Sequence, residues 1–285
     1  MPTQGGDAMP FEPIALLADI HGNLPALDAV LADALAQGVT RCVNLGDALY
    51  GPLDPAGTMA RLRQLEAGTW AGPSSPEGPD TPPAHGPTMR LAASVRGNQD
   101  RIVAAAACRR DEDDDNATMR HVLDAMAPED ILWINALQLA VVVDDVATLC
   151  HGNPYDDTAY LLENVDSGRP KPRHCDHIRA DLADTATPVV CCGHTHIPRI
   201  IRCHDTLIVN PGSVGLPAYD DDTPPLPPHA METGTPHARY AILRHTPTGY
   251  DAEPRCVTYP WGQAAAMAAA QGRRDWTRWL ATGKA

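Results

Sequence analysis

The chain has 285 residues, 44% of them hydrophobic and 20% charged, which excludes both global disorder and a fold that depends on disulfide bonds. Its 22 basic and 36 acidic residues give a net charge of −14, so we expect neither a nucleic-acid-binding surface nor an anionic membrane as a partner, although a local cationic centre could still bind phosphate. No apolar run approaches the length of about 18 residues that spans a membrane, and the start of the chain lacks the features of a secretory signal, so the sequence predicts a cytoplasmic protein.

The first half of the chain alternates short apolar runs with segments of helical periodicity, which is typical of a layered α/β domain. We predict strands at 14–18, 42–45 and 91–95, and helices at 25–37, 55–67, 100–110 and 117–127. Residues 71–88 are too rich in Pro, Gly and Ser for a packed element and are predicted to form a surface loop. The acidic run at 111–116 is predicted to be a solvated connector.

In the second half, antiparallel strands join the parallel ones. Residues 139–143 and 146–150 indicate a hairpin whose two-residue turn is Asp144 and Asp145. We predict further strands at 188–192, 207–209 and 239–244, and helices at 175–186, 263–271 and 274–280. A second Pro-rich loop is expected at 218–237, and the helical tail of about 262–285 is expected to be a packing arm.

The eight cysteines show no C-x-x-C pair, and several lie in strand-like apolar runs such as 189–192. Free cysteine is among the residue types most often buried. We therefore expect reduced core residues at all eight positions: Cys42, Cys108, Cys150, Cys175, Cys191, Cys192, Cys203 and Cys256.

Side chains of the types that bind metals stand where the predicted strands end, each beside a Gly or Pro turn. In chain order they are Asp19, His21, Asp47, Asn98, Asp100, His151, His194, His196 and Asn210. A lone His-Gly or Gly-Asp pair is usually an ordinary turn, so the argument depends on the ordered set. Because the strands of an α/β sheet end at a common edge, these turns can meet at one crevice.

The residue types and their spacing favour a site for two divalent ions. Residues two apart on an extended chain point to the same face, so both ends of the D-x-H and H-x-H segments can reach one site. Carboxylate, imidazole and amide ligands suit Mn, Fe, Zn, Ni or Co, and the carboxylates are too few for calcium. Seven of these side chains, all but Asp100 and Asn210, would be ligands, which is more than one ion needs. Two ions that share a carboxylate would use all seven and would form the clamp that promotes in-line displacement at a phosphorus atom.

The motifs DIHGN, GDALYGP, RGNQD, CHGNP, GHTH and NPGS, in this order over residues 14–215, resemble the calcineurin-like metallophosphoesterase family. They are most similar to its small bacterial phosphodiesterase branch. The resemblance implies a single metallophosphoesterase domain over residues 1–285, folded as a four-layer αββα sandwich of mixed β-sheets. It also implies a dimetal site above the sheet edges, for which we favour manganese.

The resemblance assigns two ligand sets and a bridge: Asp19, His21 and His196 for one metal, Asn98, His151 and His194 for the other, and Asp47 between them. Asp47, Asn98 and His151 would thus belong to the catalytic set. Asp100 would complete that set by orienting the site, because imidazole and amide ligands need hydrogen-bond partners to hold their rotamers.

We expect the chain to hydrolyse phosphodiesters, and phosphomonoesters less, through a hydroxide that bridges the two metals. The fullest family motif has His where this chain has Gln99, which can donate a hydrogen bond but cannot act as a general acid. This departure favours diesters, as in the branch that lacks the same His. Gln99 is a candidate for substrate binding, and so are His229 and His237, which with Tyr219 and 220–222 could line the substrate entrance.

Two alternatives stay open. The chain could be a phosphoprotein or diadenosine polyphosphate hydrolase, since relatives of similar layout have such activities and the sequence does not separate them. It could also be a non-catalytic interaction scaffold on the same fold, like the retromer scaffold subunit, which resembles this family. The intact ligand positions argue against a scaffold, because seven converging polar groups without metal would leave buried charge unsatisfied. The expected partner is a phosphate-ester substrate, and the Trp-bearing tail could cover either the core or a second copy of the chain in a homo-oligomer.

Overall fold

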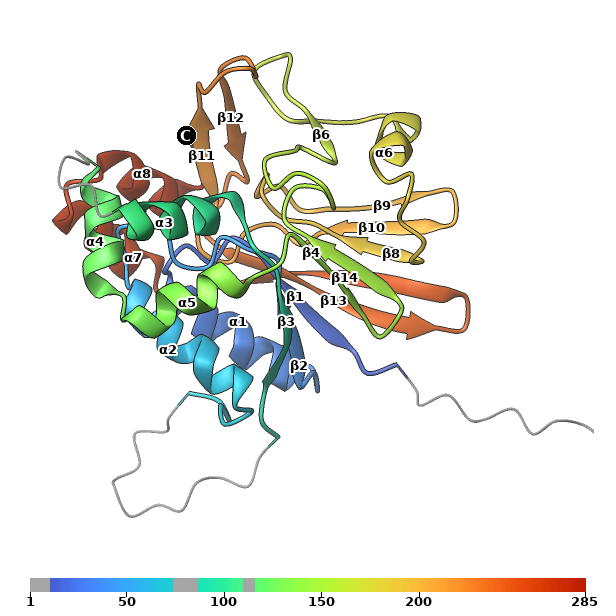
Figure 1. The fold of residues 1–285 in the computed structure, drawn as a ribbon, viewed down its shortest axis with the longest axis horizontal. Helices are drawn as coiled ribbons and strands as arrows, with labels where there is room; N and C mark the ends of the chain where they lie inside the picture. Colours follow the sequence, from blue (N-terminus) through green and yellow to red (C-terminus); the bar gives the residue numbers. More distant parts are fainter. Residues whose placement is uncertain (1–10, 74–86, 110–115) are drawn as a thin grey trace, which may run out of the picture.

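The computed structural model describes residues 11–73, 87–109 and 116–285. Two mixed β-sheets of five strands each pack face to face; several helices cover the outer face of the first sheet, and a short helix lies on the outer face of the second (Figure 1). The predicted four-layer αββα architecture is therefore confirmed. Most of the predicted loop at 71–88 and of the acidic connector at 111–116 lies outside the described residues.

The first sheet has the strand order β14-β13-β1-β2-β3. Its strands are β1 (Ile14–Leu17), β2 (Arg41–Asn44), β3 (Arg90–Ser94), β13 (Ala238–Thr246) and β14 (Gly249–Val257). β1, β2 and β3 run parallel, and β13 is antiparallel to β1 and β14. Leu17 packs in the cluster of the helices, whereas Leu16 packs against the second sheet. Burial on both faces explains why β1 reads as an unbroken apolar run.

The second sheet has the strand order β4-β5-β8-β10-β9. Its strands are β4 (Ala140–Val143), β5 (Ala147–Cys150), β8 (Val189–Cys191), β9 (Arg199–Cys203) and β10 (Thr206–Asn210). Residues 144–146 separate β4 from β5, and φ is 54° at Asp144 and 56° at Asp145. The predicted hairpin is confirmed, but its turn is one residue longer than predicted, because Val143 pairs with Ala147. Leu149, Val189 and Val209 face the first sheet and form the core between the two layers.

Most helices form a single layer against the first sheet. They are α1 (Leu24–Ala36), α2 (Pro55–Glu66), α3 (Asn98–Arg109), α4 (Ala117–Ala125), α5 (Pro128–Ala136), α7 (Trp261–Ala270) and α8 (Arg274–Thr282). The opposite outer layer holds α6 (Cys175–Asp181), whose Ile178 packs against Val190 and Ile208 of the second sheet. Within the described part of the chain, no helix combines the length and the apolar character needed to cross a membrane.

Several elements differ from the sequence predictions. The predicted loop at 218–237 contains a hairpin of β11 (Ala218–Asp221) and β12 (His229–Glu232). Its strands are four residues each and are joined by a Pro-rich turn, so their alternation is too short to stand out. The prediction did not include α5, β9, β14 or the two-residue strands β6 (Glu163–Asn164) and β7 (Lys171–Pro172). α6 ends at Asp181 and not at 186.

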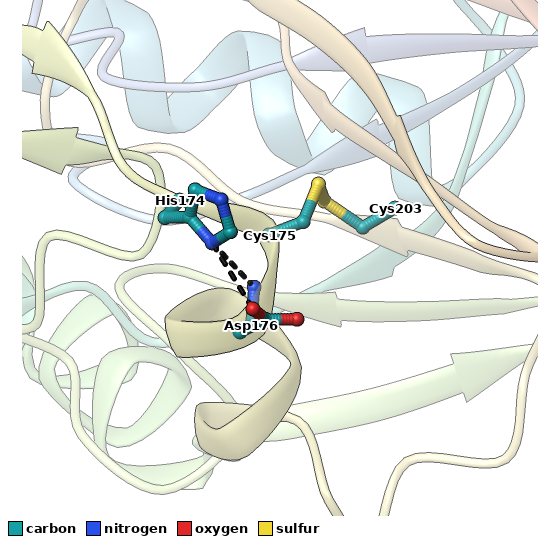
Figure 2. Close-up of a disulfide and its surroundings, with 4 residues drawn as sticks. All are labelled: His174, Cys175, Asp176 and Cys203. Carbon is teal, nitrogen blue, oxygen red and sulfur yellow. Dashed lines mark hydrogen bonds and ion pairs between the residues drawn. A yellow bond between two sulfur atoms is a disulfide. The ribbon is translucent and has the colours of Figure 1, made fainter.

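The prediction that all cysteines are reduced core residues is wrong for four of them. Cys175, at the start of α6, and Cys203, at the end of β9, form a disulfide with a Cα–Cα distance of 5.4 Å (Figure 2). Next to it, the His174 side chain accepts a hydrogen bond from the backbone N–H of Asp176. Cys108 and Cys256 are exposed. Four cysteines are buried and free as predicted: Cys42, Cys150, Cys191 and Cys192. The pair is 28 residues apart in sequence and meets only because α6 packs on the second sheet.

Candidate metal centre

The loops that follow β1, β2, β5 and β8 bring the predicted ligands together in two groups that share Asp19. The first group is Asp19, His21 and His196, and the second is Asp19, Asp47 and His151. All five side chains are buried, and the ligand atoms of each group lie within 4.8 Å of one another. Asp47 Oδ2 lies 3.4 Å from His151 Nε2 and 4.0 Å from His21 Nε2, so Asp47 reaches both groups.

In the first group the Nε2 atoms of His21 and His196 face each other. His21 Nδ1 donates to the carbonyl of Tyr50 at 2.7 Å, and His196 Nδ1 donates to that of Leu216 at 2.6 Å. In the neutral form of each ring, Nε2 then carries the lone pair, and the two Nε2 atoms lie 3.3 Å apart. Asp19 Oδ1, 3.3 Å from His196 Nε2, is buried without a hydrogen-bond partner. Three electron-pair donors without a shared proton fit a divalent cation, so these residues suit the metal that the sequence implies.

In the second group, too, a backbone carbonyl lies behind the imidazole. His151 Nδ1 donates to the carbonyl of Leu45 at 2.8 Å, which directs Nε2 at Asp47. Asn98 Oδ1 lies 3.0 Å from the same Nε2, so the amide joins this group. A carbonyl partner behind each imidazole fixes both its tautomer and its orientation, as is usual for histidines that bind metals.

His194 is the predicted ligand that lies apart from both groups. Its ring is 5.0 Å from that of His151, centroid to centroid. Its Nε2 donates to the carbonyl of Thr158 at 3.1 Å, which leaves Nδ1 as the nitrogen available to a metal. His194 therefore lies beside the second group and would present Nδ1 to a metal. The other three histidines would present Nε2.

Five of the predicted ligands have a left-handed backbone rather than the extended one expected for the D-x-H and H-x-H segments. Their φ values are 54° at Asp19, 53° at His21, 55° at Asp47, 67° at His194 and 58° at His196. Non-glycine residues in this region cost about 1–3 kcal/mol each and cluster at functional sites. Bonds between loops hold them, such as Asp19 N–H to Gly46 O and His21 N–H to Asp47 O, both 3.0 Å. The extended geometry assumed from the sequence is wrong, and tight turns bring the side chains together instead.

Glycines allow these loops to approach closely. A Cβ added to Gly97 would lie 2.0 Å from Asp47 Oδ1 and 2.5 Å from the Asp47 nitrogen. A Cβ on Gly46, whose φ is 97°, would lie 2.8 Å from His151 Nδ1. The glycines of the G-D and R-G-N motifs are therefore required by the space around Asp47 and His151.

Asp100 does not face the ligand atoms but holds the loop that carries Asp47. Its carboxylate accepts hydrogen bonds from the backbone N–H of Asp47 at 2.8 Å, Ala48 at 3.1 Å and Gly97 at 2.9 Å. Burial, together with the charge of Asp47, raises the pKa of Asp100 to about 7. Its contacts thus fasten the start of α3 to the loop after β2.

The buried charges of the centre are strongly coupled. Burial opposes ionisation of Asp47, but His151 lowers its pKa well below the usual range. Burial also opposes a charge on His151, yet Asp47 and Asp19 raise the pKa of His151 to about 10. Burial and the nearby His151 lower the pKa of His194 to about 4. In the metal-free protein His151 is therefore an imidazolium that partly balances the two carboxylates, while His194 is neutral.

A cavity of about 770 Å³ lies over this centre and reaches β11, the turn that follows it, and α8. The predicted site residues that line it are His21, Asp47, Asn98, Gln99, His194 and His196, and from the expected entrance Tyr219, Asp220 and Asp221. Gln99 also donates its backbone N–H to Asp47 Oδ1 at 2.8 Å.

Two predicted substrate-binding residues do not line this cavity. His229 is buried in β12, with Nδ1 donating to the carbonyl of Pro227 at 2.7 Å and Nε2 at 2.9 Å from the Tyr160 hydroxyl. The ring of His237 packs 5.2 Å from that of Trp261. The structure thus does not bring either imidazole to the candidate site.

Sequence reasoning did not find two cavity residues that contact the ligands. The ring of Trp276, in α8, lies 5.7 Å from that of His21, and Tyr160 lies 5.0 Å from His194. The tail was expected only to pack, and its buried Trp279 and Leu280 do so. No local pattern marks Trp276, because its partner is 255 residues away and is met only through the packing of α8.

Residues 88–225 match the family model of the calcineurin-like phosphoesterase superfamily domain. Within these residues, which make up just under half of the chain, the protein is thus similar to that domain. Members of this family use divalent metals, and the two groups that share Asp19 are candidates to hold them. The loops with Asp19, His21 and Asp47 precede the matched residues, but the structure brings them to the same centre.

Solved structures agree with this fold. A metallophosphoesterase from Sphaerobacter thermophilus is similar with 24% identity and a TM-score of 0.65, over 95% of this chain and 99% of that one. A hypothetical protein from Pyrococcus horikoshii OT3 is similar with 15% identity and a TM-score of 0.67, over 96% of this chain and 99% of that one. No curated protein gives a significant sequence match.

Proposed function

We propose that the protein is a metal-dependent phosphoesterase that uses two divalent ions, manganese above all, to hydrolyse phosphodiesters. The observation that carries the proposal is the pair of ligand groups that share Asp19 beside a cavity. The unpartnered Asp19 Oδ1 and the facing lone pairs of His21 and His196 support it, because they are costly without a cation.

The same residue sets as the sequence implies would hold the ions. One set is Asp19, His21 and His196, the other is Asn98, His151 and His194, and Asp47 would bind both. Bound divalent cations would supply Lewis-acid polarisation of the phosphoryl oxygens and a nucleophile at neutral pH. The protein itself orients the ligands through backbone carbonyls and through the hydrogen bonds of Asp100.

Gln99 supports a preference for phosphodiesters over monoesters. It lines the cavity, and its backbone is fixed against Asp47. Its amide can donate a hydrogen bond to a phosphate ester but cannot transfer a proton to a leaving oxygen. We therefore propose that esters with good leaving groups and a second substituent on phosphorus are the better substrates.

Two measurements test the proposal together: the metal content of protein purified without added ions, and hydrolysis of bis(4-nitrophenyl) phosphate and 4-nitrophenyl phosphate with and without Mn²⁺. We expect about two metals per chain and a manganese-dependent rate that is higher for the diester. Equal rates for the two esters would remove the diester preference. No metal bound after manganese addition and no hydrolysis would favour a non-catalytic scaffold.

A further inference from the structure

Three aromatic side chains form one wall of the cavity, directly against the candidate ligands. We call Tyr160, Tyr219 and Trp276 the aromatic wall. Tyr219 lies 4.7 Å from the ring of His196, Tyr160 lies 5.0 Å from His194, and Trp276 lies 5.7 Å from His21. All three line the cavity. A phosphate ester bound at the centre would therefore place an organic substituent beside aromatic rings.

Hydroxyl contacts hold the two tyrosines in place. The Tyr219 hydroxyl lies 3.0 Å from that of Tyr160 and 3.1 Å from the carbonyl of His194. The Tyr160 hydroxyl also lies 2.9 Å from Nε2 of His229, whose other nitrogen is held by a backbone carbonyl. These contacts fix the rings before any substrate binds.

Trp276 is fixed by close packing. Its side chain is buried, and a Cβ added to Gly51 would lie 3.0 Å from two of its ring atoms. The chain after α8 is tied to the chain around β12 by Gly234 N–H to Gly283 O at 2.8 Å and Ala285 N–H to Glu232 Oε1 at 3.0 Å. The helix and the β11–β12 hairpin therefore present their aromatic residues as one preformed surface.

The arginines that line the cavity are already paired with carboxylates. Arg101 makes a bidentate pair with Asp157 at 2.9 and 3.0 Å. Arg173 binds Asp181 at 2.7 Å, and Arg273 binds Asp275 at 2.6 Å. Among the residues that the structure describes, no lysine lines the cavity, whereas six carboxylates do. A second phosphate group of a substrate, bound in the cavity away from the metal centre, would therefore meet no arginine or lysine that is not already paired with a carboxylate.

We infer that the organic group held beside the metal centre is planar and uncharged, and stacks against the aromatic wall at Tyr219. This inference rests on the proposed function and narrows its substrate class to phosphodiesters that carry an aromatic substituent. A polyphosphate chain does not fit, because the wall offers ring faces and edges and no free positive charge. Tyr219 is the half-buried member of the wall and thus the one that a ligand can cover.

The test measures binding of three phosphodiesters to the manganese-loaded protein by isothermal titration calorimetry: methyl phenyl phosphate, methyl cyclohexyl phosphate and dimethyl phosphate. The phenyl and cyclohexyl groups are similar in size, but only phenyl is planar. We expect the phenyl ester to bind about threefold to tenfold tighter than the cyclohexyl ester, and dimethyl phosphate to bind weakest. Equal binding of the phenyl and cyclohexyl esters would overturn the inference, and so would no binding of any ester.

Three variants test whether Tyr219 causes the preference for the phenyl ester over the cyclohexyl ester. Tyr219→Leu should abolish it and Tyr219→Phe should keep it, whereas Tyr155→Leu, an exposed tyrosine that does not line the cavity, should leave it unchanged. A preference that survives Tyr219→Leu would also overturn the inference. Hydrolysis of bis(4-nitrophenyl) phosphate by the same preparation separates the two proposals. Binding preference without hydrolysis would contradict the proposed function alone, and hydrolysis without the preference would contradict this inference alone.

Discussion

His21 and His196 direct the same ring nitrogen at each other, with their Nε2 atoms 3.3 Å apart and both Nδ1 atoms donating to backbone carbonyls. When both rings are neutral, neither nitrogen has a proton to share with the other or with the adjacent Asp19 carboxylate. This arrangement is unfavourable in the metal-free protein and becomes favourable once a cation is bound.

Asp19→Asn should weaken metal binding without unfolding the protein. The side-chain amide can donate to His196 Nε2, 3.3 Å from the present Asp19 Oδ1, and it removes one of the negative charges that attract the cation. We expect manganese affinity to fall by about tenfold or more, while the metal-free protein melts at an equal or higher temperature. Thermal unfolding with EDTA and with Mn²⁺ measures both effects. Asp205→Asn, at an exposed position, is the control, and unchanged manganese stabilisation in Asp19→Asn would contradict the assignment.

Gly97→Ala should displace Asp47. The added Cβ would lie 2.0 Å from Asp47 Oδ1, and the backbone cannot easily retreat because Gly97 N–H is bound to Asp100 at 2.9 Å. We expect a loss of stability of about 1–3 kcal/mol, as for overpacking elsewhere, together with a loss of bound metal. Urea unfolding and elemental analysis check the two effects. The matched control is Gly262→Ala in α7, where a Cβ would meet no atom within 4 Å. Full metal content in Gly97→Ala would contradict the argument.

Metal binding should release a proton from His151. Burial opposes the charge of this imidazole, but Asp47 and Asp19 raise its pKa to about 10, so His151 is protonated at neutral pH when no metal is present. A metal ligand must be deprotonated, so at any pH below that value the cation has to displace this proton, and apparent affinity rises with pH. Calorimetric titration with Mn²⁺ at neutral pH, in buffers of different ionisation enthalpy, should report about one proton released per chain. A binding heat independent of the buffer would exclude this displacement.

Gln99→His should move activity towards monoesters. Gln99 lines the cavity at the start of α3, so an imidazole there would add a proton donor near the substrate. We expect the ratio of kcat/KM for 4-nitrophenyl phosphate to that for bis(4-nitrophenyl) phosphate to rise by about tenfold or more, since general acids contribute at least that much. Gln99→Asn, which adds no acid, should not raise it. If the ratio does not move in Gln99→His, this position does not set selectivity.

The elements that the sequence could predict are those with an unambiguous periodicity. β1 and β8 are buried on both faces and read as apolar runs. β14 was missed because it is an edge strand with Pro254 and several exposed positions, which interrupt the alternation. α5 was missed because it buries Ile134 and little else, so it shows almost no apolar stripe.

The candidate site was predictable in its residue types but not in its geometry. Strand ends and their glycine turns marked Asp19, Asp47 and His151, because ligands gather where parallel strands end. The left-handed backbone at these ligands and the contact between His21 and Trp276 depend on tertiary packing, which no local pattern encodes. The disulfide between Cys175 and Cys203 also depends on tertiary packing and is not marked by a local pattern.

The disulfide between Cys175 and Cys203 should stabilise the fold more than it affects the metal centre. It closes a segment of 28 residues, for which loop entropy predicts a contribution of about 3–4 kcal/mol. The double variant Cys175→Ser/Cys203→Ser should therefore lose about 2–4 kcal/mol of unfolding free energy in urea and keep its metal content, because neither cysteine lines the cavity. Cys108→Ser, at an exposed free cysteine, is the matched control and should change stability by less than about 0.5 kcal/mol. Equal stability of the double variant and the oxidised parent would show that the bridge does not constrain the unfolded chain as this model requires.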